Sequence, residues 1–569
     1  MSARSAISIH RLQVWAPFTA LLALAVWSTF SMWDGYWHLT HEYIWYPVRL
    51  VEYLQALRAG SLYPRWCPDF YGGYGYPFFN FYAPGVFATA AAFVLTVGAG
   101  PAVALKLAVT LFCVLGAFGM YFLAKVQTGR RDAAFLAAVV FAFVPYRFID
   151  LFVRGDLAEY SAFSLVPTAL AAYLSLTKVD ERRVPWVGFA AAVSHAAVIL
   201  CHTITGLWAT QLFAVLLGVH AWRLWRTSER RRVLALAAAF AAAMGIAAVY
   251  TMPALLEKAL VRISSIDSGP YHPTKNLVHW EWTVNTGFFA LGLPAMLGLG
   301  VALASQLLPW ARRSAGALLF FWLPSVVLWS LMQTWAEPFW RYWPLGSYIQ
   351  FPWRLLGFIG VLAAAGVAVA FSAIVKPSWR SRWPLALGLA LGVICAERSY
   401  ATAGKFLARE KIPLTPEEIA AGLNTSVLVD EYLPNTVTTP PAAPRDQVLF
   451  QARNNDTLVA LRQPGSLDYV LRVRTHDEAT VDLQVFWFPG WKLRAQSGPS
   501  QVTIGASPRG LIRLTFPRAG EYTVHVGFGL TPLRALATLL SWLSILLIYP
   551  LLRRIMRKLN GPERLSASR

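Results

Sequence analysis

The sequence predicts a polytopic α-helical membrane protein with a smaller β-rich domain near its C-terminal end. Of the 569 residues, 56% are hydrophobic and 14% are charged, about half the charged fraction of a typical soluble domain. Several apolar runs, beginning with 12–33, exceed the roughly 18 residues that cross a bilayer core. Between 398 and 531 the apolar residues recur with a period of two. These observations exclude a soluble enzyme, a disordered chain and a disulfide scaffold.

We expect about twelve membrane spans, oriented by the basic residues. Arg4 and Arg11 precede the first apolar run, which places the N-terminus in the cytoplasm. The run 81–98 is apolar enough to cross, but a crossing there would move Arg130 and every later basic loop outside. We therefore assign 81–98 to a helix in the outer interface. The predicted spans are 13–33, 103–125, 133–149, 161–177, 186–202, 205–221, 233–256, 284–308, 315–332, 353–375, 383–397 and 532–551.

This topology also accounts for the net charge of +21 without a nucleic-acid partner. Lys and Arg collect in the predicted cytoplasmic loops and in the tail after 552. In this topology both termini lie in the cytoplasm. The tail acts as a stop-transfer signal or binds anionic lipid.

Two long segments fall on the outer side. The first loop, 34–102, is rich in Trp, Tyr and Phe, and long ordered loops usually carry function. In the second, the alternation at Leu483 and Val485, with a turn at Pro489-Gly490, predicts a β-sandwich. The domain division is then a transmembrane domain over 1–397 that includes the first loop, a β-rich domain over 398–531, a last helix over 532–552 and a basic tail over 553–569.

The first candidate site follows the first span. On a helix, Asp34, His38, His41 and Glu42 would share one face, which could supply a general base or bind a divalent ion. The alternative is an ordinary polar face at the water boundary.

The second candidate site lies between two apolar spans and contains Asp150, Arg154, Asp156 and Glu159. Ionisable groups near membrane depth are costly, so they are either functional or paired with one another. Both explanations stand at this point.

Two further positions carry weaker signals. Arg354 begins a span, where its guanidinium could clamp the phosphate of a lipid-linked donor or, beside Trp353, anchor the helix in the interface. His195 and His202 lie seven residues apart on one predicted helix, and helix packing is the commoner reason for such a pair.

Several motifs occur in an order that resembles a known family. They are Asp34 and His38, then GSLYPRW at 60–66, GGYGYP at 72–77, PYR at 145–147, RGDLAE at 154–159, QFPWR at 350–354 and FPGW at 488–491. Together they resemble the bacterial membrane proteins labelled "6-pyruvoyl-tetrahydropterin synthase related". That family is similar to the GT-C superfamily of polytopic glycosyltransferases, including the YfhO-like and aminoarabinose-transferase-like proteins. The soluble pterin synthase needs a histidine zinc site, and no His-x-His pair occurs here, so we expect no pterin cofactor.

The resemblance implies a GT-C-like enzyme of the bacterial inner membrane. Such an enzyme transfers a sugar from a polyprenyl-phosphate donor to a lipid or glycan acceptor at the periplasmic face. Asp34 matches the catalytic acid of the first loop, and Asp150 or Asp156 matches the second acid. No DxD pair is present at either place, which leaves the metal requirement and any other cofactor open.

In this hypothesis Asp34 accepts the proton of the acceptor hydroxyl, and His38 orients that hydroxyl or shares a metal. Arg154 or Arg354 stabilises the departing phosphate. The other predicted substrate-binding residues are Glu159, Arg65, Trp66 and Tyr74. The alternative function is a non-catalytic envelope-assembly or lipid-handling protein on the same scaffold. A transporter is disfavoured, because charges in mid-span are few.

Overall fold

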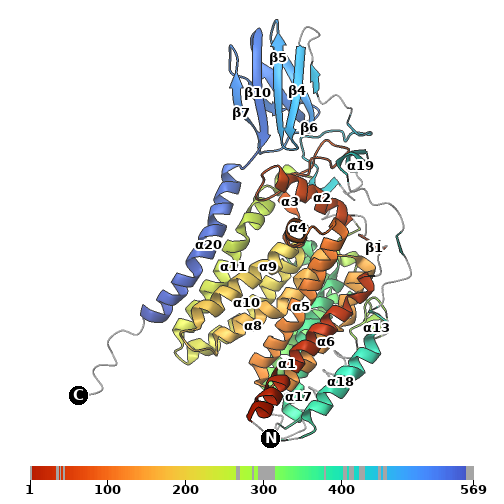
Figure 1. Ribbon diagram of the computed structural model, residues 1–569, viewed down its shortest axis with the longest axis vertical. Coiled ribbons are helices and arrows are strands. Elements are labelled where there is room, and N and C mark those ends of the chain that lie inside the picture. The colour runs from red at the N-terminus through yellow and green to blue at the C-terminus, as the bar shows by residue number, and fades with distance from the viewer. Residues whose placement is uncertain are drawn as a thin grey trace, which may run out of the picture.

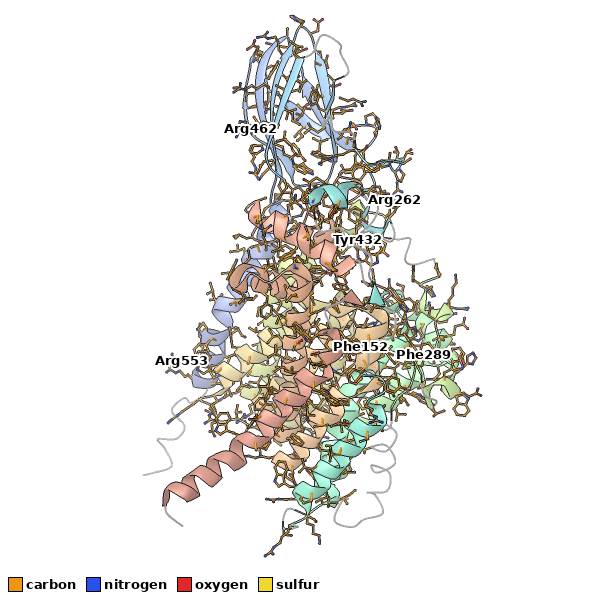
Figure 2. The ribbon with its side chains drawn as sticks, turned by 45° about the vertical axis from the view of Figure 1, so that its right-hand side comes forward. Phe152, Arg262, Phe289, Tyr432, Arg462 and Arg553 are labelled. Atoms are coloured by element: carbon orange, nitrogen blue, oxygen red, sulfur yellow. The ribbon has the colours of Figure 1, made fainter. Side chains whose placement is uncertain are left out.

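The computed structural model contains a bundle of long helices with two β-sheets standing at one end of it (Figure 1). It describes residues 3–33, 37–38, 40–42, 45–263, 270–284, 287–292, 314–376, 378, 380–401, 407–408, 415–421, 430–445, 450–452 and 458–558. In a second view, Arg462 lies in the sheets, Tyr432 between sheets and bundle, and Arg553 at the side of the bundle, at about the height of Phe152 (Figure 2).

The helices of the bundle follow the predicted spans. They are α1 (Ala3–Ser28), α5 (Pro101–Thr128), α6 (Arg131–Ala142), α8 (Leu157–Leu176), α9 (Val184–Cys201), α10 (Thr203–Arg226), α11 (Arg230–Leu256), α15 (Ala315–Met332), α17 (Leu355–Ile374), α18 (Arg382–Glu397) and α20 (Pro532–Lys558). Most of the predicted span 284–308 lies outside the described residues.

Among the described residues, seven helices are long and apolar enough to cross a membrane, fewer than the twelve spans predicted. One reason is length. At 1.5 Å per residue, the 16 residues of α18 extend about 24 Å, less than the roughly 30 Å of a hydrocarbon core. A polytopic helical protein with a C-terminal β-domain is nevertheless what the chain forms.

The helices pack closely where the sequence supplies small residues. A Cβ added to Gly116 of α5 would lie 2.9 Å from the carbonyl oxygen of Ser164, and one on Gly119 would lie 2.1 Å from Oγ1 of Thr168. Since Ser164 and Thr168 belong to α8, these two glycines set the close approach of α5 and α8.

The first loop forms short elements instead of one long helix. These are β1 (Trp37–His38), α2 (Trp45–Arg58), α3 (Phe78–Phe81) and α4 (Gly85–Val97). The 13 residues of α4 extend about 20 Å, too short for a crossing, while the side of the membrane on which 81–98 lies stays a prediction.

The remaining helical elements are short turns that connect the long ones. They are η1 (Phe30–Trp33), α7 (Pro145–Ile149), η2 (Asp150–Arg154), η3 (Lys258–Leu260), η4 (Pro273–Lys275), α13 (Trp280–Val284), η6 (Thr334–Ala336), α16 (Glu337–Tyr342), η7 (Ser347–Ile349), η8 (Pro352–Arg354), α19 (Pro416–Ala421) and η9 (Asp430–Tyr432).

The predicted helical face is wrong for the described residues of this segment, 37–38 and 40–42, whereas Asp34 lies outside the described residues. Trp37 and His38 form β1, which pairs antiparallel with β2 (Leu407–Ala408). The backbone N–H of Glu42 donates to the carbonyl of Arg154, at 3.1 Å. Long-range backbone pairing of this kind replaces the i to i−4 bonds that a helix would need.

The C-terminal domain consists of two four-stranded antiparallel sheets. Their strand orders are β4-β5-β10-β7 and β3-β6-β9-β8. The strands are β3 (Phe450–Ala452), β4 (Leu458–Gly465), β5 (Asp468–Thr475), β6 (Ala479–Phe486), β7 (Trp491–Ser497), β8 (Thr503–Ala506), β9 (Leu511–Phe516) and β10 (Gly520–Phe528). The predicted alternation is confirmed, because Leu483, Val485, Leu514 and Val524 are all buried.

Trp66 of the first loop anchors the β-domain to the bundle. Its side chain is 1% exposed. The ring lies edge-on to Trp491, with 5.6 Å between centroids, and 5.4 Å from the ring of Phe528. The first loop and the β-domain therefore share one aromatic core.

Replacing Trp66 by alanine is expected to lower the free energy of unfolding by about 3–5 kcal/mol, the usual cost of emptying a buried aromatic site. Trp280 is 51% exposed, so Trp280→Ala is the matched control and should change little. Thermal unfolding and protease release of the β-domain measure both. Equal behaviour of the two variants would show that the aromatic core does not hold the domains together.

Candidate functional site

Four charged residues of the second candidate site meet because of the local backbone. The helix that includes α6 and α7 ends in the π-helical turn η2, and Gly155 stops it with φ +67°. A Cβ at Gly155 would lie 1.9 Å from Oγ1 of Thr40, so only glycine fits here. Asp156 then caps α8, and one of its carboxylate oxygens accepts the N–H of Glu159 at 3.0 Å.

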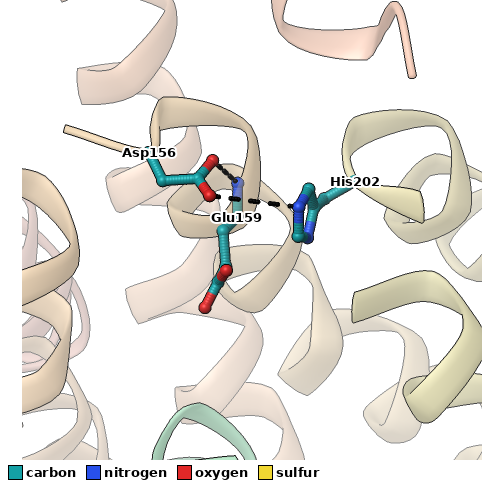
Figure 3. A group of neighbouring side chains, drawn as sticks. All are labelled: Asp156, Glu159 and His202. Atoms are coloured by element: carbon teal, nitrogen blue, oxygen red, sulfur yellow. Dashed lines mark hydrogen bonds and ion pairs between the residues drawn. The ribbon is translucent and has the colours of Figure 1, made fainter. Parts of the chain in front are cut away.

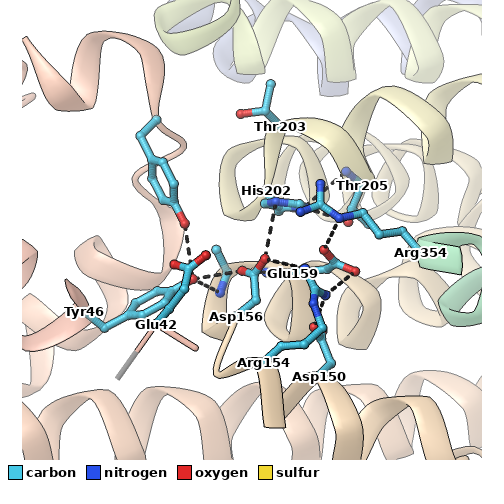
Figure 4. Close-up of polar contacts among 12 residues, drawn as sticks. Glu42, Tyr46, Asp150, Arg154, Asp156, Glu159, His202, Thr203, Thr205 and Arg354 are labelled. Atoms are coloured by element: carbon cyan, nitrogen blue, oxygen red, sulfur yellow. Dashed lines mark hydrogen bonds and ion pairs between the residues drawn. The ribbon is translucent and has the colours of Figure 1, made fainter. Parts of the chain in front are cut away.

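We call Asp150, Arg154, Asp156 and Glu159 the Arg154 cluster (Figure 4). The guanidinium of Arg154 pairs with Glu159 at 2.9 Å and with Asp156 at 3.2 Å, and it also contacts Asp150. All four side chains are buried. A buried charge without a partner is very costly, so each of these charged side chains depends on the others for its stability in the folded protein.

His202 approaches the same cluster from the junction of α9 and α10. Its Nε2 lies 4.0 Å from Oδ2 of Asp156. One ligand atom each from Asp156, Glu159 and His202 lie within 4.8 Å of one another, a grouping that could hold a metal ion (Figure 3).

The donors of this group are already engaged. Both carboxylates pair with Arg154. Nδ1 of His202 accepts the N–H of Thr205 at 3.3 Å, which leaves the proton of a neutral imidazole on Nε2. A divalent ion bound here has to displace both that proton and part of the Arg154 pairing.

Glu42 is one of the four residues of the first candidate site. It lies beside Asp156 (Figure 4) and pairs with Arg49 at 3.2 Å. Tyr46, one helical turn later, donates its hydroxyl proton to Asp156 at 2.9 Å. The first loop thus contributes an acid to the cluster, at Glu42. Asp34, the residue predicted for that role, lies outside the described residues.

Arg354 reaches the cluster from the start of α17. Its Nε lies 3.1 Å from Oε2 of Glu159. Nη1 of Arg354 is buried and has no hydrogen-bond partner within the described part of the chain. A buried guanidinium N–H without an acceptor is costly and therefore marks a place where a ligand can bind.

These groups face a cavity of about 490 Å³, a volume typical of small-molecule sites. We call it the Asp156 cavity. Its polar end is formed by Glu42, Asp156, His202, Arg354, Arg49, Lys258 and Glu431. Much of the remaining wall is apolar and comes from α9, α10 and α11, for example from Ile199, Leu207 and Met244.

The environment separates the pKa values of the two neighbouring carboxyls. Burial raises the pKa of Glu42, and the Asp156 carboxylate raises it further. Burial by itself also raises the pKa of Asp156, but His202, Arg154 and Arg354 outweigh it and hold that pKa well below its usual range. Burial lowers the pKa of His202.

The cavity also contains a third carboxyl, that of Glu431. Burial raises the pKa of Glu431 to about 7. The cavity therefore holds one carboxylate fixed in its charged form and two carboxyls whose pKa values are raised, an arrangement typical of acid–base sites.

The other predicted site residues lie elsewhere. His38 is in β1, and its side chain is not among those described. Arg65 donates to Oδ1 of Asn80 at 3.1 Å and to the carbonyl of Val249 at 2.7 Å. Trp66 packs on the β-domain, and Tyr74 stacks on Phe486 at 5.3 Å. Neither Arg65 nor these two aromatic residues line the Asp156 cavity, so we leave them out of the proposed site.

The fold and this buried cluster define a polytopic membrane protein with a ligand-binding cavity between its helices and its first loop. The model of the 6-pyruvoyl-tetrahydropterin synthase related domain, described as a membrane protein, matches residues 79–402. The chain belongs to this family. The matched region contains the second candidate site and Arg354, and it ends before the β-sheets. No curated protein matches the sequence.

Solved structures that are similar to this chain include two transferases. The arabinofuranosyltransferase AftD from Mycobacteria is 19% identical over 69% of this chain, with a TM-score of 0.47. The oligosaccharyltransferase AglB from Archaeoglobus fulgidus is 14% identical over 69%, with a TM-score of 0.41. This chain covers 27% of the first protein and 56% of the second.

Proposed function

We propose that the protein transfers a sugar from a polyprenyl-phosphate donor to an acceptor hydroxyl in the Asp156 cavity. The observation that carries this proposal is the free Nη1 of Arg354, a buried cationic donor facing a cavity whose other wall is apolar. A phosphate oxygen is the acceptor that such a guanidinium binds best.

The apolar wall fits the lipid part of this donor. The cavity is lined by Ile199, Leu207, Met244 and Leu255. All four belong to helices that are long and apolar enough to cross a membrane. A phosphate held by Arg354 and Lys258 would place the first isoprene units against these side chains. In this proposal the rest of the polyprenyl chain extends out of the cavity between the helices.

Glu42 is the proposed general base. It takes the proton of the acceptor hydroxyl while the acceptor oxygen forms a bond to the anomeric carbon. The bond between that carbon and the phosphate oxygen breaks, and the polyprenyl phosphate leaves with its electron pair. A base works best when its pKa lies near the working pH, and the pKa of Glu42 is raised in that direction.

The Arg154 cluster positions these groups. Asp156 holds Tyr46 through a hydrogen bond and Glu159 holds Arg354 through an ion pair, so both sides of the cavity are tied to α8. In the proposed orientation the cavity and the β-sheets face the periplasm of a bacterial inner membrane, and both termini are cytoplasmic.

A second candidate function is lipid handling without turnover. The same apolar wall and the same free guanidinium nitrogen would bind a polyprenyl phosphate without transferring anything. Binding of polyprenyl phosphate together with no release of sugar from any donor would support this alternative over the enzyme.

The test uses purified protein in lipid with a panel of radiolabelled polyprenyl-phosphate sugars. Replacing Arg354 by lysine keeps the charge but removes the two-nitrogen fork, and we expect the KM for the donor to rise about ten- to hundredfold. Arg341 is exposed, so Arg341→Lys is the control. An unchanged KM in Arg354→Lys would remove Arg354 from the phosphate site.

A further inference from the structure

The end of the bundle away from the β-sheets contains a second cavity, of about 810 Å³. We call it the Arg131 cavity. It lies between α1, α5, α6 and α18, and both α1 and α18 begin at this end in Figure 1. It therefore lies far from the Asp156 cavity, and the proposed function makes no use of it.

The cavity is strongly cationic. Lys125, Arg130, Arg131 and Arg382 line it, against the single carboxylate of Asp132. Asp132 is paired with Arg130, whose guanidinium also donates to the carbonyl of Val375. Arg130 is thus fixed in the wall, and the described lining contains no further carboxylate to pair with Lys125 or Arg131.

Arg131 is the most available of these cations. It is exposed, and no ion pair to it occurs among the residues that the structure describes. Nζ of Lys125 donates to the carbonyl of Gly129, a neutral partner. A cavity with this charge attracts an anion.

The remaining lining residues are apolar or aromatic, and two candidate membrane spans meet at this cavity. The candidate span Pro101–Thr128 ends here and the span Arg131–Arg154 begins here. Apolar surface comes from Ala16, Pro17, Ala20, Phe135 and Leu387, and Trp383 lies beside Phe135 with 6.3 Å between ring centroids. Tryptophan is typical of the level of lipid headgroups.

Small residues create the space. Ala16 and Ala20 are one helical turn apart on α1, and nothing lies within 4 Å of a Cβ added to Gly129. Larger residues at these positions would fill the opening between α1 and α5.

We propose that the Arg131 cavity binds the phosphate headgroup of an anionic phospholipid. Lys125 and Arg131 hold the phosphate, and the apolar residues of α1, α6 and α18 contact the glycerol and the first part of the acyl chains. The distribution of basic residues predicts that this end faces the cytoplasmic leaflet, where basic pockets between helices hold such headgroups.

The test counts lipids retained by the purified full-length protein in native mass spectrometry. Micelles contain equal amounts of phosphatidylglycerol and phosphatidylcholine. We expect phosphatidylglycerol to be retained preferentially, and the double variant Lys125→Gln with Arg131→Gln to bind it about 25-fold more weakly, since each basic residue near a membrane surface contributes roughly fivefold.

Two further variants distinguish the effect of cavity size on lipid retention from the effect of charge. Ala20→Phe narrows the cavity without altering any charge and should also reduce retention. The exposed pair Arg182→Gln with Arg183→Gln removes the same charge from the neighbouring α8–α9 loop, outside the cavity, and should leave retention unchanged.

Three results would overturn the proposal. They are equal retention of the two lipids, equal losses in the cavity pair and the loop pair, and full displacement of phosphatidylglycerol by soluble glycerol 1-phosphate at equal concentration. The last result would show that the cavity binds a free phosphate ester. If the cavity double variant does not fold, Ala20→Phe carries the same comparison.

Discussion

Replacing Glu42 by glutamine is expected to lower the rate of sugar transfer by about two to four orders of magnitude, the usual contribution of a general base. Glu42 lines the Asp156 cavity, lies beside Asp156 and has a raised pKa. The amide keeps the size of the side chain but cannot take the acceptor proton. Transfer by purified protein at saturating donor measures the effect.

The pH profile gives an independent readout. A base must be ionised, so kcat of the wild type should fall as pH decreases through the pKa of Glu42, at a pH above the ordinary 4.5. Glu431→Gln is the matched variant, because Glu431 lines the same cavity and its pKa is raised to about 7. If Glu431→Gln or Asp34→Asn abolishes turnover while Glu42→Gln retains it, the base is not Glu42.

The second large effect concerns stability. Replacing Arg154 by glutamine leaves the buried carboxylates of Asp150, Asp156 and Glu159 without their main cation. We expect the free energy of unfolding to fall by about 3–5 kcal/mol, the cost of breaking a buried ion pair from one side. The midpoint of thermal unfolding in detergent measures it.

An exposed arginine pair serves as the control. Arg341 pairs with Glu337, and the two side chains are 61% and 46% exposed. Arg341→Gln should change the free energy of unfolding by less than about 1 kcal/mol. A similarly small change in Arg154→Gln would mean that the cluster does not support the fold.

The difference between Arg154→Gln and the wild type should depend on pH. The pKa of Asp156 is depressed in the folded protein, so its stabilising contribution is present above the unfolded pKa of about 3.9 and is lost as pH falls through the folded value. The variant lacks much of this contribution at neutral pH. The gap between the two proteins should therefore be widest near neutrality and narrow below about pH 4.

Some of the site could be predicted because it is local in sequence. Asp150, Arg154, Asp156 and Glu159 lie within ten positions, so any helical turn there brings several of them together. Arg354 was a candidate because its guanidinium, at the start of a span, could clamp the phosphate of a lipid-linked donor. What the pattern could not show is that Arg354 pairs with Glu159 while its Nη1 has no hydrogen-bond partner among the described residues.

Other predictions failed or stayed untested for a physical reason. The helical face over 34–42 depended on local spacing, whereas backbone bonds to residues 407–408 and to Arg154 decide the conformation there. Glu42 became a site residue through those long-range bonds. Trp66 and Tyr74 look like sugar-stacking residues in the sequence, but the β-domain buries them.

The sequence by itself determined the membrane class, the general course of the helices and the two-sheet domain, because hydrophobic length and period act locally along the chain. Only the tertiary structure decided which acid of the first loop meets Asp156, which guanidinium nitrogen stays free and where cations gather around open space. Those properties depend on contacts between segments that lie up to several hundred residues apart, and no local pattern encodes them.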